Sequence, residues 1–231
     1  MAELVDLFIA GVQKAGTTAL FEYVRDWPTI AAPAHKELHF FDDESVDWRC
    51  PDYGRMHRAY PPADGRMRIE ATPISIYWPP SLGRIRVYNP AAKLVFIFRE
   101  PCDRALSQWK MEYRKGNDSR DFSRAIREPT PDQPRLGYLE RGMYAAQLQR
   151  ALALFPREQM LLVRSVDLAE DPTETLRAFA MFAGLPPPPP THRKAENVGP
   201  EGGMSGADRD FLISYFAEDQ RRFTLLTGLH L

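Results

Sequence analysis

Residues 4–28, LVDLFIAGVQKAGTTALFEYVRDWP, predict a strand, a glycine-containing loop and a helix in direct succession. The almost unbroken apolar run at residues 4–10 is typical of a strand buried on both faces, because a half-exposed strand would alternate apolar with polar residues. A turn is expected at residues 11–16. From Thr17 onward apolar side chains recur on one helical face until Pro28 ends the pattern.

The same succession recurs further along the chain. Residues 94–98 predict a second strand, followed by a helix from Pro101 to about residue 115. A third strand is expected at residues 160–163, between helices at 143–154 and 172–183. This alternation predicts an α/β fold with a P-loop-type, doubly wound parallel sheet flanked by helices, as a single domain over residues 1–231.

The loop after the first strand has the GxxxxG spacing of a phosphate-binding loop, where free backbone N–H groups and the helix dipole favour an anion. A nucleoside triphosphatase would carry lysine directly after the second glycine, but Thr17 stands there and the lysine lies inside the loop. The expected anion contacts are Lys14, Ala15, Gly16, Thr17 and Thr18. The alternative is an ordinary strand-to-helix turn with a solvent-exposed lysine.

Two segments resemble a known family. Residues 8–20, FIAGVQKAGTTAL, resemble the 5′-phosphosulfate loop of sulfotransferases that use 3′-phosphoadenosine 5′-phosphosulfate (PAPS). Residues 97–109, IFREPCDRALSQW, resemble the 3′-phosphate segment of the same family, and the resemblance implies that Arg99 and Ser107 bind that phosphate. Arg99 in a surface ion pair with Glu100 or Asp103, and Ser107 as an ordinary helix serine, are the alternatives.

Residues 35–42, HKELHFFD, resemble the Glu-x-His-Phe-Phe-Asp stretch of glycosaminoglycan-type sulfotransferases. The resemblance implies that Glu37 is the catalytic base, with His39 and Asp42 beside the acceptor. Screening by the two adjacent phenylalanines is expected to raise the pKa of Glu37 toward that task. His39 as a core histidine and the phenylalanines as plain packing are the alternative. Glu70, after an expected strand at residues 67–69, is the rival base, unless it forms a buried ion pair with an arginine.

The chain departs from those relatives at two places. Many of them carry lysine after the glutamate of a Glu-x-Thr-Pro segment, where this chain has Ala71. They also carry a late cysteine pair that braces the loop over the nucleotide, whereas no cysteine follows Cys102. The corresponding loop here is expected at residues 194–204, and Lys194 is a candidate contact to the 3′-phosphate. The resemblance thus implies that one electrophilic helper is missing at Ala71, and the lack of the cysteine pair puts a heparan-type acceptor in doubt.

Composition limits the other possibilities. With 30 basic and 31 acidic side chains, the formal charge of −1 predicts no nucleic-acid partner. The isolated Cys50 and Cys102 predict no metal site, and the lack of a long apolar run or signal peptide predicts a cytoplasmic protein without a membrane partner.

The predicted activity is transfer of a sulfuryl group from PAPS to a hydroxyl or amine of a saccharide or small-molecule acceptor. A P-loop kinase of a small metabolite, and a nucleotide-binding module without catalysis, remain alternatives.

Overall fold

The computed structural model describes residues 4–62, 64–128, 136–187 and 204–231. They form two compact units. Unit 1 contains the described residues up to Phe98 together with 150–187, and unit 2 contains the described residues from Arg99 to Gln149 together with 204–231. The prediction that residues 1–231 form a single domain stays a prediction.

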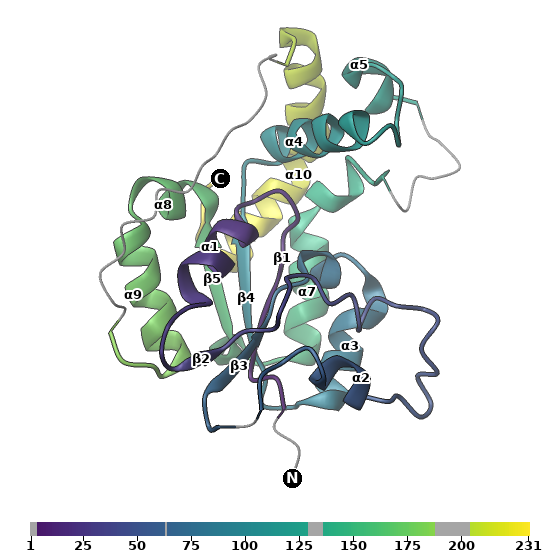
Figure 1. The fold of residues 1–231 in the computed structure, drawn as a ribbon. Coiled ribbons are helices and arrows are strands. Elements are labelled where there is room, and N and C mark those ends of the chain that lie inside the picture. Colours follow the sequence, from purple (N-terminus) through teal and green to yellow (C-terminus); the bar gives the residue numbers. More distant parts are fainter. Residues whose placement is uncertain (1–3, 63, 129–135, 188–203) are drawn as a thin grey trace. The chain divides into compact units, whose positions relative to one another are not determined.

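The described part of unit 1 is built around a five-stranded, wholly parallel sheet with strand order β2-β3-β1-β4-β5 (Figure 1). All five residues of β1 are buried, and so are five of the six in β4, because helices cover both faces of the sheet. The strands are β1 (Leu7–Gly11), β2 (Ile30–Ala31), β3 (Met67–Glu70), β4 (Lys93–Phe98) and β5 (Met160–Arg164).

Helices lie on both sides of this sheet. In Figure 1, α1, α8 and α9 lie on one side, and α2 and α3 lie on the other. Trp27, just after α1, packs edge-on against Phe179 of α9, with ring centroids 5.7 Å apart. The helices and 3₁₀ turns within unit 1 are α1 (Thr17–Val24), α2 (Gly54–His57), η1 (Pro73–Ile76), α3 (Pro79–Tyr88), η3 (Arg157–Gln159), α8 (Ser165–Glu170) and α9 (Pro172–Ala183).

Unit 2 is helical in its described part and has a hydrophobic core of its own. Phe122, Tyr138, Leu212 and Phe216 are buried together in that core. Gly142 lies so close to Phe216 that an added Cβ would be 2.6 Å from the ring. The elements are α4 (Pro101–Arg114), α5 (Phe122–Ala125), η2 (Glu140–Gly142), α7 (Tyr144–Leu154, whose last residues belong to unit 1) and α10 (Gly206–Thr227).

The predicted α/β fold with a parallel sheet is confirmed, and most expected elements lie within one or two residues of their predicted bounds. The first strand begins at Leu7 rather than residue 4, because Leu4 is exposed and the Val5 amide donates to the Tyr88 hydroxyl. The sequence patterns did not predict α3. Its two prolines occupy the first turn, where a missing N–H costs nothing.

Candidate active site

The loop between β1 and α1 has a backbone shape that brings it close to the edge of the sheet. The Val12 amide donates to the Ile97 carbonyl of β4 at 2.8 Å, which ties the loop to the neighbouring strand. Lys14 and Gly16 both have positive φ, 72° and 102°. Two reversals within three residues turn the chain sharply from the strand into the helix.

Glycine is needed at the two ends of the loop for different physical reasons. A Cβ at Gly11 would lie 2.5 Å from Cγ2 of Ile76 in η1, so only glycine allows this close approach. A Cβ at Gly16 would make only ordinary contacts, the nearest 3.6 Å from Cδ2 of Leu168, but the left-handed φ of Gly16 is strained for any residue with a side chain. The GxxxxG spacing therefore reflects one packing contact and one backbone conformation.

The start of α1 has the chemistry expected of an anion site. Gly16 is the N-cap, so no side chain caps the helix there, and the first turn contains no acidic residue. First-turn N–H groups lack intrahelical acceptors, and the helix dipole adds positive potential. Thr17 is buried, Thr18 is exposed, and Lys14 is half-buried. These groups fit a phosphate-like ligand, although the contacts predicted for residues 14–18 stay predictions.

The Glu37 segment (residues 35–42) follows β2 and lies against the end of β3. Three successive amides of the segment donate to three successive residues. The Glu37 amide bonds the Ala71 carbonyl at 3.2 Å, the Leu38 amide bonds Oε1 of Glu70 at 3.3 Å, and the His39 amide bonds Oγ1 of Thr72 at 3.4 Å. One backbone carbonyl and two side chains thus hold the segment, in which Glu37 and His39 both have positive φ, 63° and 49°.

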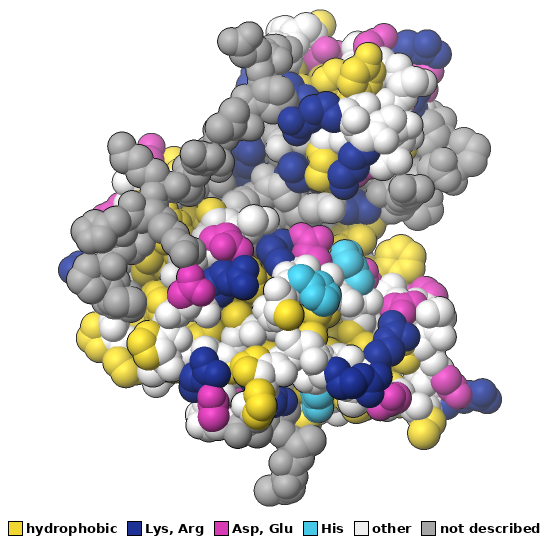
Figure 2. Space-filling model, in the orientation of Figure 1, with side chains coloured by type: hydrophobic (Ala, Val, Ile, Leu, Met, Phe, Trp, Pro, Cys, Tyr) yellow, Lys and Arg dark blue, Asp and Glu magenta, His cyan; other side chains and the backbone are white. Residues whose placement is uncertain are grey.

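Four charged side chains gather on this segment. Glu37 contacts the ammonium of Lys36 through Oε1 and lies 3.4 Å from Nε2 of His39 through Oε2. Nδ1 of His39 lies 2.7 Å from Oδ2 of Asp42. Histidine, acidic and basic side chains can be seen close together on the face of the molecule drawn in Figure 2.

This arrangement reverses one expectation for Glu37. The hydrogen bond from His39, followed by the interactions with Lys36, lowers the pKa of Glu37 to about 2 and outweighs the effect of burial. The hydrogen bonds to Asp42 and then Glu37 raise the pKa of His39 to about 10. The prediction that apolar screening raises the pKa of Glu37 was wrong, because its carboxylate faces two cations and its side chain is 36% exposed.

The adjacent phenylalanines have a packing role. Phe40 and Phe41 are buried, and the ring of Phe41 lies 5.6 Å from that of Phe8 in β1 and 5.4 Å from that of Tyr88 in α3. They anchor the Glu37 segment to the sheet and leave the carboxylate of Glu37 at the surface. The plain-packing alternative is confirmed for these two rings. His39, by contrast, is half-exposed and is not a core histidine.

Glu70 has the opposite environment to Glu37. It is buried, and burial raises its pKa to about 7 despite hydrogen bonds from Thr72 and the Leu38 amide. The hydroxyl of Thr72 donates to Oε1 of Glu70 at 2.5 Å. The ion pair with an arginine that was considered for Glu70 is not found among the described residues, where its partners are this hydroxyl and the amide.

The predicted 3′-phosphate residues belong to unit 2. Arg99 directly follows β4, and its carbonyl accepts a hydrogen bond from the hydroxyl of Tyr144 at 2.9 Å. Ser107 lies within α4 and is half-buried. Glu100 caps α4 by accepting from the amides of Cys102 and Asp103, and the carboxylate of Asp103 lies 3.0 Å from Arg209. These carboxylates therefore have partners other than Arg99.

Two of the predicted site segments lie at neighbouring strands of unit 1. The loop at residues 11–16 follows β1, and residues 70–72, which bind the Glu37 segment, lie at the end of β3. These two strands are neighbours in the sheet. Open α/β sheets bind ligands at this carboxyl edge. Arg99 and Ser107 lie in unit 2, and Lys194 lies outside the described residues. Lys36 and Thr72 were not predicted, although a Glu-x-Thr-Pro segment directly after a strand could have indicated Thr72.

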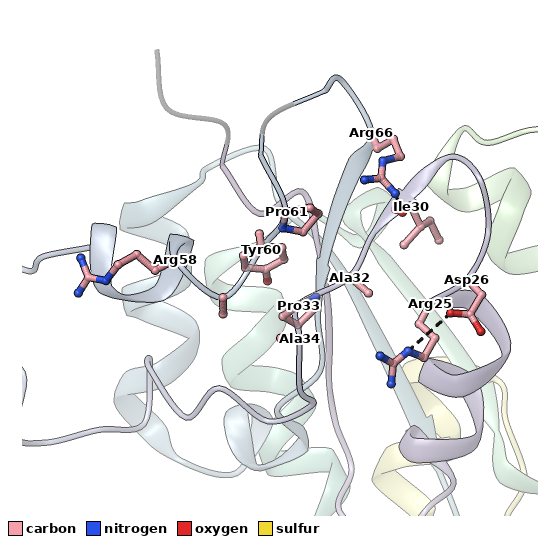
Figure 3. Close-up of a pocket in the computed structure, with 11 residues that line it drawn as sticks. Arg25, Asp26, Ile30, Ala32, Pro33, Ala34, Arg58, Tyr60, Pro61 and Arg66 are labelled. Carbon is pink, nitrogen blue, oxygen red and sulfur yellow. Dashed lines mark hydrogen bonds and ion pairs between the residues drawn. The ribbon is translucent and has the colours of Figure 1, made fainter.

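A cavity of about 540 Å³ lies beside the edge strand β2 (Figure 3). Arg25 and Arg66 line it, but Arg25 lies 3.8 Å from Asp26, and Arg66 pairs with Asp64 and donates to the carbonyl of Ile30. In Figure 3 the side chain of Arg58 points away from the other lining residues. None of the predicted site residues lines this cavity.

Two kinds of feature are absent from the described residues 4–62, 64–128, 136–187 and 204–231. No group of three or more histidine, cysteine, aspartate or glutamate side chains there is arranged to hold a metal ion. No helix in that part is long and apolar enough to cross a membrane. The predicted cytoplasmic location stays a prediction.

The parallel sheet, the glycine loop after β1 and the helix that starts at Gly16 define the class of α/β proteins with a phosphate-binding loop. Within that class, the family model of the sulfotransferase domain matches residues 4–197, so the chain belongs to the sulfotransferase family. The predicted family is thereby confirmed.

Comparisons with individual proteins agree. The chain is 31% identical over 191 residues to human heparan sulfate glucosamine 3-O-sulfotransferase 3B1, covering 79% of this chain and 47% of that protein. It is 29% identical over 196 residues to mouse heparan sulfate glucosamine 3-O-sulfotransferase 5, covering 80% and 55%. The chain thus spans about half the length of these relatives.

Solved structures show the same fold. A sulfotransferase from Alicyclobacillus acidocaldarius superposes with a TM-score of 0.81 at 27% identity, covering 100% of this chain and 98% of that one. The sulfotransferase domain from the curacin biosynthetic pathway has a TM-score of 0.59 at 16% identity, covering 80% and 76%. Mouse sulfotransferase SULT7A1, solved in complex with PAP (adenosine 3′,5′-bisphosphate), has a TM-score of 0.50 at 15% identity, covering 95% and 66%.

Proposed function

We propose that this protein transfers a sulfuryl group from PAPS to a hydroxyl or amine of a saccharide or small-molecule acceptor. One observation carries the proposal. The loop with the chemistry of an anion site follows β1, and the segment with the accessible carboxylate of Glu37 lies against the end of the neighbouring strand β3. The mouse neighbour that contains PAP supports a donor of this kind. The heparan sulfate relatives support a saccharide acceptor, and the lack of a cysteine after Cys102 counts against one of the heparan type.

In the proposed reaction the acceptor oxygen or nitrogen attacks sulfur, and the bond from sulfur to the bridging phosphate oxygen breaks. Its electron pair leaves with the phosphate, which becomes part of adenosine 3′,5′-bisphosphate. Lys14 and the first-turn amides of α1 would stabilise the charge on that oxygen by preorganised electrostatics. The acceptor proton goes to Glu37.

The low pKa of Glu37 keeps it in the ionised form that accepts a proton, but also makes it a weak base. We infer that a bound acceptor hydroxyl replaces the contact from Lys36 to Oε1 of Glu37. Loss of such a contact raises the pKa of Glu37 and so increases its basicity at the moment of transfer. His39 stays protonated between the two carboxylates and keeps Glu37 oriented.

The test is Glu37→Gln, which keeps the shape of the side chain and removes its basicity. We expect affinity for adenosine 3′,5′-bisphosphate, measured by calorimetry, to stay within about twofold, while single-turnover transfer falls by ~10²-fold or more. Glu218→Gln, on the exposed surface of α10, is the matched control. Normal transfer by Glu37→Gln would show that another group takes the proton.

The alternatives make different predictions. A small-metabolite kinase would bind magnesium-ATP more tightly than PAPS. A non-catalytic module would bind the nucleotide and transfer nothing to any acceptor in a panel of saccharides, phenols and amines. Calorimetry with both nucleotides, followed by that panel with purified protein and PAPS, separates the three functions.

A further inference from the structure

We propose that Glu70 and Thr72 act as a positioning pair, which holds the Glu37 segment in its working conformation without accepting the substrate's proton. This inference rests on the proposed function, in which Glu37 is the base. It assigns a role to two buried residues that the chemistry described above does not use.

The first argument is backbone strain. Glu37 and His39 both have left-handed φ values, and neither is glycine. Residues with a Cβ keep such conformations only where their surroundings enforce them. The amides of Leu38 and His39 are held by two side chains, Glu70 and Thr72, that come from the end of β3, 32 and 33 residues later in the sequence.

The second argument is the geometry of the pair. Oε1 of Glu70 accepts from both the Leu38 amide at 3.3 Å and the Thr72 hydroxyl at 2.5 Å. The same hydroxyl oxygen accepts from the His39 amide at 3.4 Å. The two side chains therefore orient each other, and together they bind the two amides that follow Glu37.

The third argument is access. Glu70 and Thr72 are each only 3% exposed, whereas the side chain of Glu37 is 36% exposed. A proton on an acceptor at the surface can reach Glu37 but not Glu70. The charged groups that act on Glu70 are Lys36, which favours its ionised form, and Asp42, which opposes it. A pKa raised by burial to about 7 would suit a base, but the acceptor's proton cannot reach this buried carboxyl group, so its role is that of a hydrogen-bond acceptor.

Side-chain substitutions distinguish positioning from proton transfer. Both hydrogen bonds to Glu70 converge on Oε1, so the single carbonyl oxygen of glutamine can accept both. We expect Glu70→Gln to transfer within about threefold of the wild-type rate. Glu70→Leu and Thr72→Val, which remove the acceptor or the hydroxyl, should lower kcat by about tenfold or more and leave the affinity for adenosine 3′,5′-bisphosphate unchanged. Thr72→Ser should restore kcat.

A second measurement does not depend on activity. Hydrogen exchange should show faster exchange of the Leu38 and His39 amides in Thr72→Val, with unchanged exchange in β4. Thr175→Val is the control, since it makes the same chemical change at another buried threonine, in α9. If Glu70→Leu does not fold, the Thr72 variants still test whether the pair positions the Glu37 segment.

Two results would overturn the proposal. Normal kcat with normal amide exchange in Thr72→Val would show that the pair does not hold the segment. Loss of transfer in Glu70→Gln as complete as in Glu37→Gln would make Glu70 a proton acceptor. If the wild-type protein transfers no sulfuryl group, the proposed function fails, and the exchange measurement still tests the positioning role.

Discussion

Nε2 of His39 lies 3.4 Å from Oε2 of Glu37, so the carboxylate proposed as the base has an imidazolium as its neighbour. The other imidazole nitrogen of His39, Nδ1, lies 2.7 Å from Oδ2 of Asp42. A histidine held between two carboxylates is stabilised in its charged form, and it stabilises the charged form of Glu37 in return. The protonation of Glu37 is therefore set by His39 as much as by its own exposure.

Replacing His39 should change the titration of Glu37. We expect His39→Gln to raise the pKa of Glu37 from about 2 toward its ordinary value of 4.5, because the hydrogen bond from His39 is the largest cause of the lowering. Carbon-detected NMR titration of the glutamate carboxyl groups measures this shift. His35→Gln, an exposed neighbour, is the control. An unchanged titration of Glu37 would disprove the coupling.

The same pair predicts how stability depends on pH. The pKa of His39 is raised from 6.5 to about 10, so its contribution is complete below about pH 6.5 and is lost as the pH rises through 10. The pKa of Glu37 is lowered, so its contribution is present above about pH 4.5 and is lost as the pH falls toward 2. The stability difference between wild type and His39→Gln should therefore be largest between about pH 4.5 and 6.5, measured by denaturant unfolding.

Lys14→Ala should affect the chemical step more than nucleotide binding. The lysine charge is most useful when the leaving oxygen becomes anionic, and removing one such donor typically costs ~10²-fold in kcat. Single-turnover kinetics and calorimetry with adenosine 3′,5′-bisphosphate separate the two effects. Lys115→Ala, at the exposed end of α4, is the control. A pure affinity defect with normal kcat would make Lys14 only a binding residue.

Arg99→Ala should weaken binding of nucleotides that carry a 3′-phosphate. A hydrogen bond to a charged group is typically worth ~1.5–3 kcal/mol, which corresponds to roughly a 10- to 150-fold loss of affinity. Calorimetry should show this loss for adenosine 3′,5′-bisphosphate and little change for adenosine 5′-phosphosulfate, which lacks the 3′-phosphate. An equal loss for both nucleotides would contradict the assignment of Arg99.

Gly11→Ala should destabilise the fold, because its Cβ would lie 2.5 Å from Cγ2 of Ile76. Overpacking of this kind costs ~1–3 kcal/mol. Gly83→Ala is the matched control, since Gly83 lies within α3 with open space around it, and alanine there should stabilise by about 0.5–1 kcal/mol. Denaturant unfolding with comparison of midpoints measures both changes. Equal stability of the two variants would show that Ile76 yields at little cost.

Much of the fold could be predicted because it depends on local patterns. The buried strand β4 is a continuous apolar run, and α9 was predicted with the bounds that it has, since Pro172 begins it and Gly184 ends it with a left-handed conformation. The bounds of α1 were less accurate. Its apolar face continues to Trp27, but the helix ends at Val24 and a turn carries Trp27 against Phe179.

The sequence by itself determined most of the order of strands and helices and the glycine loop, and it supplied the candidate site residues, because spacing along one segment encodes these features. Only the tertiary structure decided the electrostatics. Glu70 is the last residue of β3 and Glu37 lies in the segment held against it, yet Glu37 faces Lys36 and His39 near the surface, whereas Glu70 is buried and accepts from the Leu38 amide. A carboxylate's pKa depends on its burial and on which side chains the folded backbone brings to it. The contacts from His39 and Lys36 therefore lowered the pKa of Glu37, whereas burial raised the pKa of Glu70.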